Sequence, residues 1–245
     1  MRRVFGRPVL HNPKIMATFA PEIIKSDIMR VVNLGATDSV INTYMAQLRD
    51  AEVQKNRLQF RQNLTRIAHA MAYEISRTMR YVPQTVRTPL AEAKVRMPED
   101  HVVVGTVLRA GLAFHQGFLD VFDNADSAFV AAYREEGNKD DIQIHIDYMA
   151  APDLKDSTFL LVDPMLATGG SLQLAYKTFL RHGVPSRLHI CVAIAAEEGI
   201  RRLQEAFPFD EVTLWTAAID PELNDKAYIV PGLGDAGDLC FGPKL

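Results

Sequence analysis

From residue 101 onward, short apolar runs alternate with helix-length segments, and this alternation constrains the fold more than any other feature of the sequence. Four apolar runs occupy residues 101–107, 158–163, 187–194 and 211–217. Segments with helical spacing of apolar residues occupy 113–122, 171–182 and 197–207. Continuous apolar runs are typical of parallel strands buried on both faces, and helices of this length form the crossovers between such strands. The pattern predicts an α/β fold with a mostly parallel, twisted sheet flanked by helices.

A helical N-terminal layer is expected ahead of this sheet. Apolar residues recur at three- and four-residue spacing at Phe60, Leu64, Ile67, Met71, Ile75 and Met79. That spacing places them on one face of a helix, which we expect to cover residues 38–81 and to pack on the core. Pro83 and Pro89 end the pattern, and residues 91–97 are expected to form a short strand of a hairpin.

Two further extended segments predict a long β-hairpin arm. They span residues 127–134 and 141–149, and every other residue of 142–148 is apolar. Such alternation is typical of a half-exposed strand. The polar segment EEGNKDD, which begins at Glu135, connects the two strands. We expect this arm to close over a binding site.

The composition is that of a globular protein, and it argues against several functional classes. Hydrophobic residues make up 48% of the chain and charged residues 23%, with a formal net charge of -3. The chain therefore has no general attraction to nucleic acid or anionic lipid, and no apolar run approaches the roughly 18 residues of a membrane helix. Cys191 and Cys240 lie far apart and outside any CxxC pair, so neither a disulfide framework nor a metal cluster is predicted. We expect a cytoplasmic protein without nucleic-acid or membrane partners.

We expect residues 1–28 to be an extension and residues 29–245 to form a single domain. No linker or internal repeat divides the second part of the chain. The first fourteen residues carry four basic side chains and no acid, but the extension lacks the apolar core of a secretory signal. Two alternatives stay open for it, a disordered N-terminus or a start codon placed too early, with Met29 as the first residue.

The segment FLLVDPMLATGGS, residues 159–171, carries the strongest functional signal. Asp163 stands at the C-terminal end of a predicted strand, where open α/β sheets bind their ligands. The pair Gly169 and Gly170 then leads into a predicted helix. Glycines leave backbone amides accessible, and a helix N-terminus favours negative charge. A phosphate group is therefore the expected ligand.

This segment matches neither of the common nucleotide-binding motifs. It lacks the lysine of the P-loop and the spacing of the GxGxxG motif. Asp163 lies four residues before the expected phosphate cradle, and a carboxylate accepts hydrogen bonds from ribose hydroxyls. The segment therefore predicts a site for a ribose 5-phosphate.

Together with YIVPGLGDAGD, residues 228–238, the segment DPMLATGGS resembles the uracil phosphoribosyltransferase family of type I phosphoribosyltransferases. The resemblance runs from about Met29 to near the C-terminus and includes VLRAGLAFHQGFL and AAIDPELN. It implies the type I phosphoribosyltransferase fold. It also implies a step of pyrimidine salvage, in which uracil and 5-phosphoribosyl 1-diphosphate are converted to UMP and diphosphate with Mg²⁺.

The resemblance implies roles for individual residues. The expected catalytic residues are Arg109, Arg134, Asp163 and Asp235. The expected site for 5-phosphoribosyl 1-diphosphate comprises Arg109, Arg134, Asp163, Pro164, Met165, Leu166, Ala167, Thr168, Gly169, Gly170, Ser171 and Asp235. The expected uracil contacts are Ile229, Gly234, Asp235 and Ala236, and Tyr228 is expected to line the pocket. Guanidinium groups suit the diphosphate because they offer forked donors to phosphate oxygens. The resemblance implies that Asp235 contacts the ribosyl diphosphate directly or through Mg²⁺, and no side chain is assigned as a direct Mg²⁺ ligand.

Two alternatives to this function stay open. One is another type I phosphoribosyltransferase that acts on orotate or a 6-oxopurine, against which residues 228–238 argue. The other is an RNA-binding regulator on the same fold that senses phosphoribosyl diphosphate, and the net charge of -3 argues against the basic face it would need. The resemblance further implies a homodimer or higher homo-oligomer in which the hairpin arm embraces a partner subunit.

Overall fold

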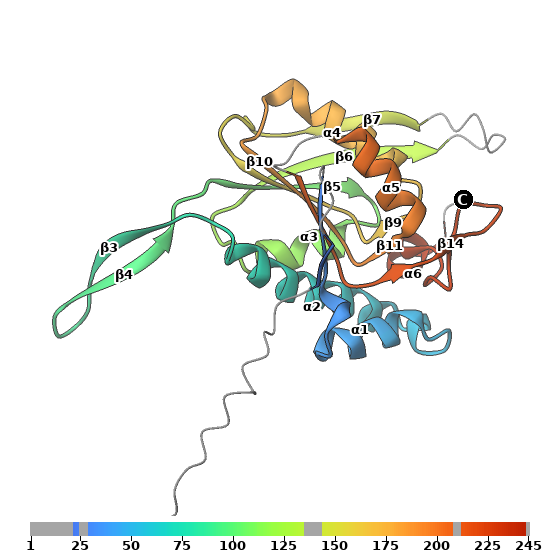
Figure 1. The fold of residues 1–245 in the computed structure, drawn as a ribbon, viewed down its shortest axis with the longest axis horizontal. Helices are drawn as coiled ribbons and strands as arrows, with labels where there is room; N and C mark the ends of the chain where they lie inside the picture. The colour runs from blue at the N-terminus through green and yellow to red at the C-terminus, as the bar shows by residue number, and fades with distance from the viewer. Residues whose placement is uncertain (1–21, 25–28, 135–143, 208–211, 244–245) are drawn as a thin grey trace, which may run out of the picture.

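The computed structural model describes residues 22–24, 29–134, 144–207 and 212–243 (Figure 1). Its central sheet contains, in chain order, β1 (Glu22–Ile24), β2 (Arg30–Asn33), β5 (Val102–Leu108), β6 (Asp126–Arg134), β7 (Ile144–Ala150), β8 (Thr158–Val162), β10 (Arg187–Val192) and β12 (Val212–Thr216). In space the order is β1-β2-β12-β10-β8-β5-β6-β7. The strands from β2 to β6 in this order are parallel, whereas β1 and β7 pair antiparallel at the two edges. The predicted mostly parallel sheet is confirmed.

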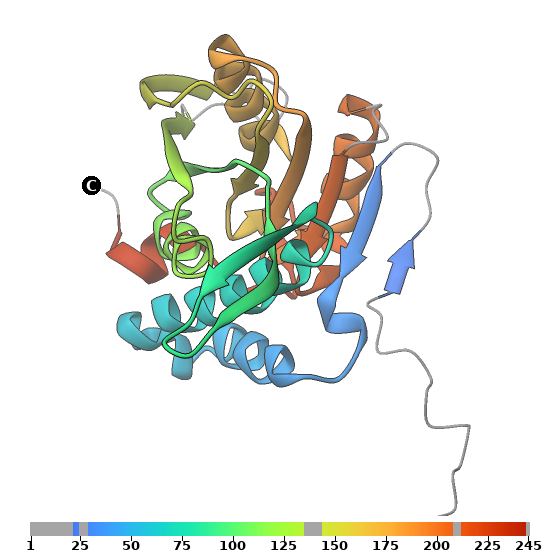
Figure 2. The same cartoon turned by 90° about the vertical axis from the view of Figure 1, so that its left-hand side faces the viewer.

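Helices cover both faces of this sheet (Figures 1 and 2). One face carries α1 (Val40–Arg49), α2 (Arg57–Ser76), α3 (Leu112–Leu119) and α6 (Ala236–Phe241), and the other carries α4 (Gly170–Phe179) and α5 (Glu197–Ala206). Strand residues alternate between the two cores: Val102 and Val104 face the first, and Val103 faces the second. The two-faced burial explains why these strands have continuous apolar sequences.

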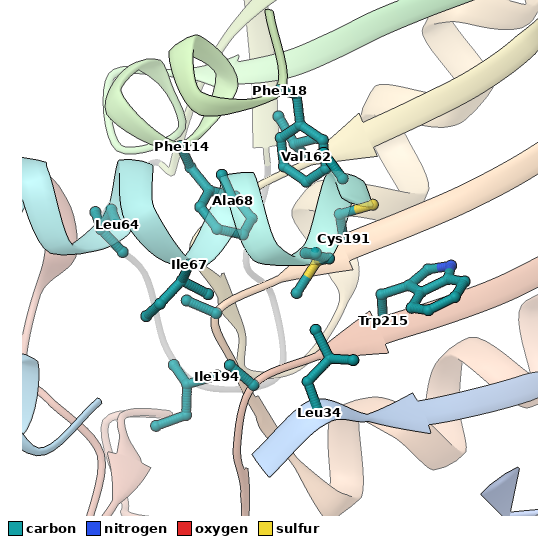
Figure 3. Packing of buried hydrophobic residues seen from close by; sticks show 14 of the residues in the cluster. Leu34, Leu64, Ile67, Ala68, Phe114, Phe118, Val162, Cys191, Ile194 and Trp215 are labelled. Atoms are coloured by element: carbon teal, nitrogen blue, oxygen red, sulfur yellow. The ribbon is translucent and has the colours of Figure 1, made fainter. Parts of the chain in front are cut away.

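The core beneath α2 contains the apolar stripe that the sequence predicts. Leu64, Ile67 and Ala68 of α2 lie with Phe114 and Phe118 of α3 over the sheet (Figure 3). The two phenylalanine rings meet edge to face, with centroids 5.3 Å apart. The stripe is therefore part of the core rather than part of a binding surface.

The helical layer is confirmed, but the prediction of one helix over residues 38–81 is wrong. α1 ends at Arg49, and a short 3-10 turn, η2 (Val53–Lys55), precedes α2. Asp50 accepts hydrogen bonds from the N–H groups of Glu52 and Val53, and Asn56 caps α2 by accepting from Gln59 N at 3.2 Å. Short polar side chains compete with helical hydrogen bonds in this way and end the helix.

The antiparallel pairing of β6 with β7 is confirmed, but this hairpin is the edge of the main sheet. Ala128 and Val130 of β6 are completely buried, because residues 126–131 of β6 also pair with β5. The hairpin that projects from the body consists of β3 (Tyr81–Arg87) and β4 (Glu92–Pro98) (Figure 1). The expected hairpin over residues 127–149 is therefore present, a second hairpin projects at residues 81–98, and closure of the first over a binding site stays a prediction. The segment EEGNKDD lies outside the described residues.

Short strands extend the sheet toward the functional site. β9 (Met165–Leu166), β11 (Ile194–Ala196) and β13 (Ile219–Asp220) form a small parallel sheet beyond the C-terminal ends of β8, β10 and β12. β14 (Glu222–Leu223) pairs with β15 (Ile229–Val230), and η1 (Leu34–Ala36) and η3 (Leu180–His182) complete the regular elements of the described residues. None of the helices in the described ranges combines the length and apolar content needed to cross a membrane.

Candidate active site

The loop between β8 and α4 contains the predicted phosphate site. Asp163, at the end of β8, is half-buried, and its N–H donates to the Cys191 carbonyl over 3.0 Å. β9 then pairs in parallel with β11, which buries Leu166 completely and leaves Met165 partly exposed. Main-chain pairing therefore holds this loop against the end of the sheet.

The N-terminus of α4 is open to an anion. Gly169 precedes the helix with a φ of 81°, and no side chain caps it. The first amides of a helix have no intrahelical acceptor, and the helix dipole favours negative charge near them. Residues with a Cβ adopt this left-handed conformation only at a cost, which explains the glycine at position 169. The geometry suits a phosphate group.

A glycine on α5 determines how closely this helix supports the loop. A Cβ added to Gly199 would lie 2.2 Å from the carbonyl oxygen of Ala167 and 3.0 Å from Cγ of Leu166. No side chain larger than hydrogen fits at such a distance from a backbone atom. The absence of a side chain at Gly199 therefore lets α5 pack directly behind the phosphate loop.

Asn224 organises the turn that forms the opposite wall. Its Oδ1 accepts hydrogen bonds from Lys226 N at 2.9 Å and Tyr228 N at 3.0 Å. The main chain closes the same turn, because Ala227 N donates to Asn224 O and Asn224 N donates to Tyr228 O, both over 2.9 Å. The turn presents Lys226, Ala227 and Tyr228 to a common cavity.

Asp235 connects this wall to α6. It is the N-cap of α6, and its Oδ1 accepts from Asp238 N at 2.9 Å. Arg109 approaches from the end of β5 and donates from Nη2 to Asp238 Oδ1 and to Gly242 O, each over 3.3 Å. Arg109, the residue that follows β5, is therefore hydrogen-bonded to Asp238 of α6 and to Gly242.

These segments surround a cavity of about 590 Å³ beyond the C-terminal ends of β5 and β8. The predicted site residues that line it are Arg109, Asp163, Met165, Ala167, Thr168, Gly169, Ser171, Gly234, Asp235 and Ala236. Pro164, Leu166, Gly170 and Ile229 do not line it, and all of these but Gly170 are buried. Arg134 is the last residue of β6, and its side chain lies outside the described atoms. Two segments about 65 residues apart in sequence thus meet in one cavity.

A model of the family described as uracil phosphoribosyltransferase matches residues 36–243 of the chain. The chain belongs to the uracil phosphoribosyltransferase family. A uracil phosphoribosyltransferase from Porphyromonas gingivalis is 48% identical over 217 residues, which cover 89% of this chain and 100% of the relative. One from Pyrococcus furiosus is 39% identical over 204 residues, which cover 82% of this chain and 85% of the relative.

A solved structure is similar to this chain in fold as well as in sequence. The AQ2163 protein from Aquifex aeolicus is 32% identical, with a TM-score of 0.76, over 86% of this chain and 98% of that chain. The resemblance predicted from DPMLATGGS and YIVPGLGDAGD is confirmed by the family match, and with it the type I phosphoribosyltransferase fold.

Positive and negative side chains are equal in number around the cavity. Among the described residues that line it, Arg109 and Lys226 are cationic and Asp163 and Asp235 are anionic. A ligand with phosphate and diphosphate groups therefore gains from an added cation, and carboxylate oxygens are ligands that Mg²⁺ accepts. No group of three or more His, Cys, Asp or Glu side chains in the described part of the chain could hold a metal. A bound Mg²⁺ would thus take most of its ligands from substrate and water.

Three residues of this site are not among those predicted from the sequence: Lys226, Asn224 and Gly199. A glycine inside a predicted helix costs about 1 kcal/mol relative to alanine, so Gly199 in the segment 197–207 was a usable sign of close packing. Asn224 ends the segment AAIDPELN, and Lys226 lies two positions before Tyr228. Their place beside a matched motif was the only sign of their role.

Proposed function

We propose that this chain transfers the 5-phosphoribosyl group from 5-phosphoribosyl 1-diphosphate to uracil, giving UMP and diphosphate. The observation that carries the proposal is the cavity in which the loop after β8 meets the segment 234–236. The family match over residues 36–243 supports uracil as the base, rather than orotate or a 6-oxopurine. The relatives from Porphyromonas gingivalis and Pyrococcus furiosus are both named uracil phosphoribosyltransferase.

The loop of residues 163–171 binds the ribose 5-phosphate in this proposal. Amides at the uncapped N-terminus of α4 donate to the phosphate oxygens, and the Asp163 carboxylate accepts from ribose hydroxyls. Because this phosphate is remote from the reacting carbon, its binding free energy orients the ribose for reaction. Pro164, Leu166 and Gly170 contribute by holding the loop in shape.

Main-chain groups of Gly234, Asp235 and Ala236, which line the cavity, recognise the base, and the buried Ile229 supports them without lining the cavity. Uracil offers carbonyl acceptors at C2 and C4, whereas cytosine carries an amino group at C4. A backbone N–H that faces O4 would oppose the amino group of cytosine and leave both donors unpaired. A site built to hydrogen-bond one edge discriminates by roughly 10⁴-fold against an analogue that cannot pair. Tyr228 lines the same cavity and packs beside the ligand.

Arg109 and Arg134 stabilise the leaving diphosphate, and Lys226, which lines the same cavity as Arg109, adds a third cation. The bond from uracil N1 to ribose C1 forms as the bond from C1 to the diphosphate oxygen breaks, through a transition state with oxocarbenium character, and the proton of uracil N1 is released to water. Positive side chains that meet the charge developing on diphosphate lower this barrier. Mg²⁺, when bound with the substrate beside Asp163 or Asp235, supplies further charge neutralisation.

The proposal includes a cytoplasmic homodimer or larger homo-oligomer. The projecting hairpin β3–β4 carries exposed apolar side chains, with Leu90 at 97%, Met97 at 43% and Val86 at 39% relative exposure. Exposed apolar side chains on a projecting element favour contact with another protein surface. A second copy of the chain is the partner that the family resemblance implies.

A single assay tests the function. The purified chain is given 5-phosphoribosyl 1-diphosphate and Mg²⁺ with uracil, cytosine, orotate or hypoxanthine, and the nucleotides are separated by chromatography. UMP from uracil alone, abolished by EDTA, is the expected result. A nucleotide formed from another base would show that this base, and not uracil, is the substrate. Binding of the ribosyl diphosphate without any product, together with RNA retention at about 200 mM salt, would instead indicate a regulator.

A further inference from the structure

An ion pair outside the cavity is hydrogen-bonded to the segment proposed to read the base. Arg49, the last residue of α1, donates from Nη1 and Nη2 to the two carboxylate oxygens of Asp220, each over 2.7 Å. The same Nη1 donates to Gly232 O over 3.1 Å, and Gly232 N donates to Asp220 Oδ2 over 2.8 Å. The pair thus holds both the carbonyl and the N–H of one glycine.

This arrangement brings together segments that are distant in sequence. Arg49 and Asp220 are 171 positions apart, and Asp220 belongs to β13, which pairs with β11 beside the phosphate loop. The Asp220 side chain is 5% exposed and the Arg49 side chain 26%. Gln54 also donates from Nε2 to Arg49 O over 3.2 Å, which fixes the end of α1. Gly232 is therefore attached to two rigid elements rather than held by its loop alone.

Stability alone is a weak reason for such a pair. Burying an ion pair costs desolvation energy that its attraction barely repays, so apolar residues would serve the core equally well. A bidentate arginine and carboxylate instead fix direction, because the planar guanidinium accepts only a narrow range of partner positions. Here the pair is hydrogen-bonded to both main-chain groups of Gly232, so it fixes the orientation of the main chain two residues before Gly234.

We infer that Arg49 and Asp220 are positioning residues that hold the main chain of residues 229–236 in the geometry that reads uracil. This inference rests on the proposed function. Neither side chain lines the cavity, so both act through Gly232 and not by contact with substrate. The phosphate cradle follows β8 and is held by main-chain pairing of β9 with β11, so we expect it to keep its geometry when the side chains of the ion pair are replaced.

Steady-state kinetics of Arg49→Ala and Asp220→Asn test the inference. We expect the uracil KM to rise roughly 10- to 100-fold, because a displacement of about 1 Å in a positioning group has effects of this size. The KM for 5-phosphoribosyl 1-diphosphate is expected to stay within about threefold, and the preference for uracil over cytosine to fall. Arg49→Lys retains the charge but not the fork, and it is expected to recover only part of the uracil KM.

Arg77→Ala is the matched control. Arg77 also forms an ion pair, with Glu74 at 3.0 Å, but it is 58% exposed and does not line the cavity. This variant is expected to keep both KM values. Equal rises in both KM values for Arg49→Ala, or no change in either, would overturn the inference while leaving the proposed function intact.

Amide hydrogen exchange gives a readout that does not depend on activity. In Arg49→Ala and Asp220→Asn, amides of residues 229–236 are expected to exchange faster than in the wild type, whereas those of α4 keep their protection. Unchanged exchange at residues 229–236 would overturn the inference. If the wild type made no UMP, the proposed function would fail, and this exchange result would still decide whether the pair orders the segment.

Discussion

Arg109 and Asp238 lie 3.3 Å apart, from Nη2 to Oδ1, and this contact joins the end of β5 to the C-terminal helix beside the cavity. Both side chains are 41% exposed. The same guanidinium nitrogen also donates to Gly242 O. Arg109 is therefore oriented in the cavity wall by α6 while part of its surface stays open to a ligand.

Replacing Arg109 by alanine is expected to lower kcat by roughly 10²- to 10³-fold, because one charge-stabilising donor in a transition state contributes about this much. The melting temperature should change little, since exposed ion pairs contribute at most about 1 kcal/mol. Turnover and thermal unfolding of the same preparation check both statements.

Arg202→Ala is the control for this variant, because Arg202 pairs with Glu198 at the surface of α5 and does not line the cavity. It is expected to retain wild-type kcat. Full turnover of the Arg109→Ala protein would show that Arg109 does not stabilise the transition state.

Replacing Gly199 by alanine is expected to displace the phosphate loop. The new Cβ would meet the Ala167 carbonyl at 2.2 Å, so the loop or α5 must move. We expect the KM for 5-phosphoribosyl 1-diphosphate to rise roughly tenfold or more, because small misplacements of binding groups have large kinetic effects. Initial rates at varied concentrations of each substrate measure this.

Gly117→Ala provides a matched steric change elsewhere. A Cβ at Gly117 would lie 2.5 Å from Thr65 O, at the contact of α3 with α2 and away from the phosphate loop. This variant is expected to lose stability but to keep its KM. If both variants changed that KM equally, the specific support of the loop by Gly199 would be excluded.

Lys226→Ala is expected to weaken binding of 5-phosphoribosyl 1-diphosphate by roughly tenfold, because one cation of the cavity wall is lost without burying a new group. Lys226 is exposed, so unfolding should be unaffected. Equilibrium binding to this variant and to Lys177→Ala, an exposed lysine of α4, gives the comparison. Equal affinities of both variants would contradict a role for Lys226.

His189 is expected to make stability depend on pH. Burial, with a smaller contribution from the charge of Arg187, lowers the pKa of His189 from 6.5 to about 3. Trp215 donates to His189 Nδ1 over 3.0 Å, so the neutral ring carries its proton on Nε2. The unfolded chain binds a proton below pH 6.5 that the folded chain refuses until about pH 3, so stability is greatest above pH 6.5 and falls as the pH falls.

The contribution of His189 is about 1.4 kcal/mol of unfolding free energy per pH unit in this window. Urea unfolding from pH 7.5 to pH 4 measures it in the wild type and in His189→Gln, whose side chain does not titrate and offers an oxygen acceptor in place of Nδ1. The variant is expected to show a shallower loss. The same slope in both proteins would show that His189 titrates normally.

Local sequence patterns predicted the parts of this fold that local physics determines. The runs that form β5, β8, β10 and β12 are long and apolar, so the sequence alone predicts that these strands are buried. β2 has only four residues and pairs with β12, about 180 positions later, so no local pattern shows it. The break between α1 and α2 depends on Asp50 and Asn56, whose capping contacts interrupt an otherwise helical stripe.

The site was predictable where a motif is continuous and not where it depends on tertiary contacts. The segment 163–171 contains its glycines, acid and hydroxyls in one run, and Asp163, Thr168 and Ser171 all line the cavity. Arg49 and Asp220 meet only after α1 and β13 pack together. Their role depends on a contact between two residues that are far apart in sequence, and no local pattern predicts such a contact.

The most direct test of the site is a crystal structure of the protein with UMP, the proposed product. We expect the 5′-phosphate at the N-terminus of α4, within hydrogen-bonding distance of amides in residues 168–171, and the uracil ring against the main chain of Gly234 and Ala236. UMP bound outside this cavity, or bound with its phosphate at residues 234–236 and its base at α4, would contradict the account.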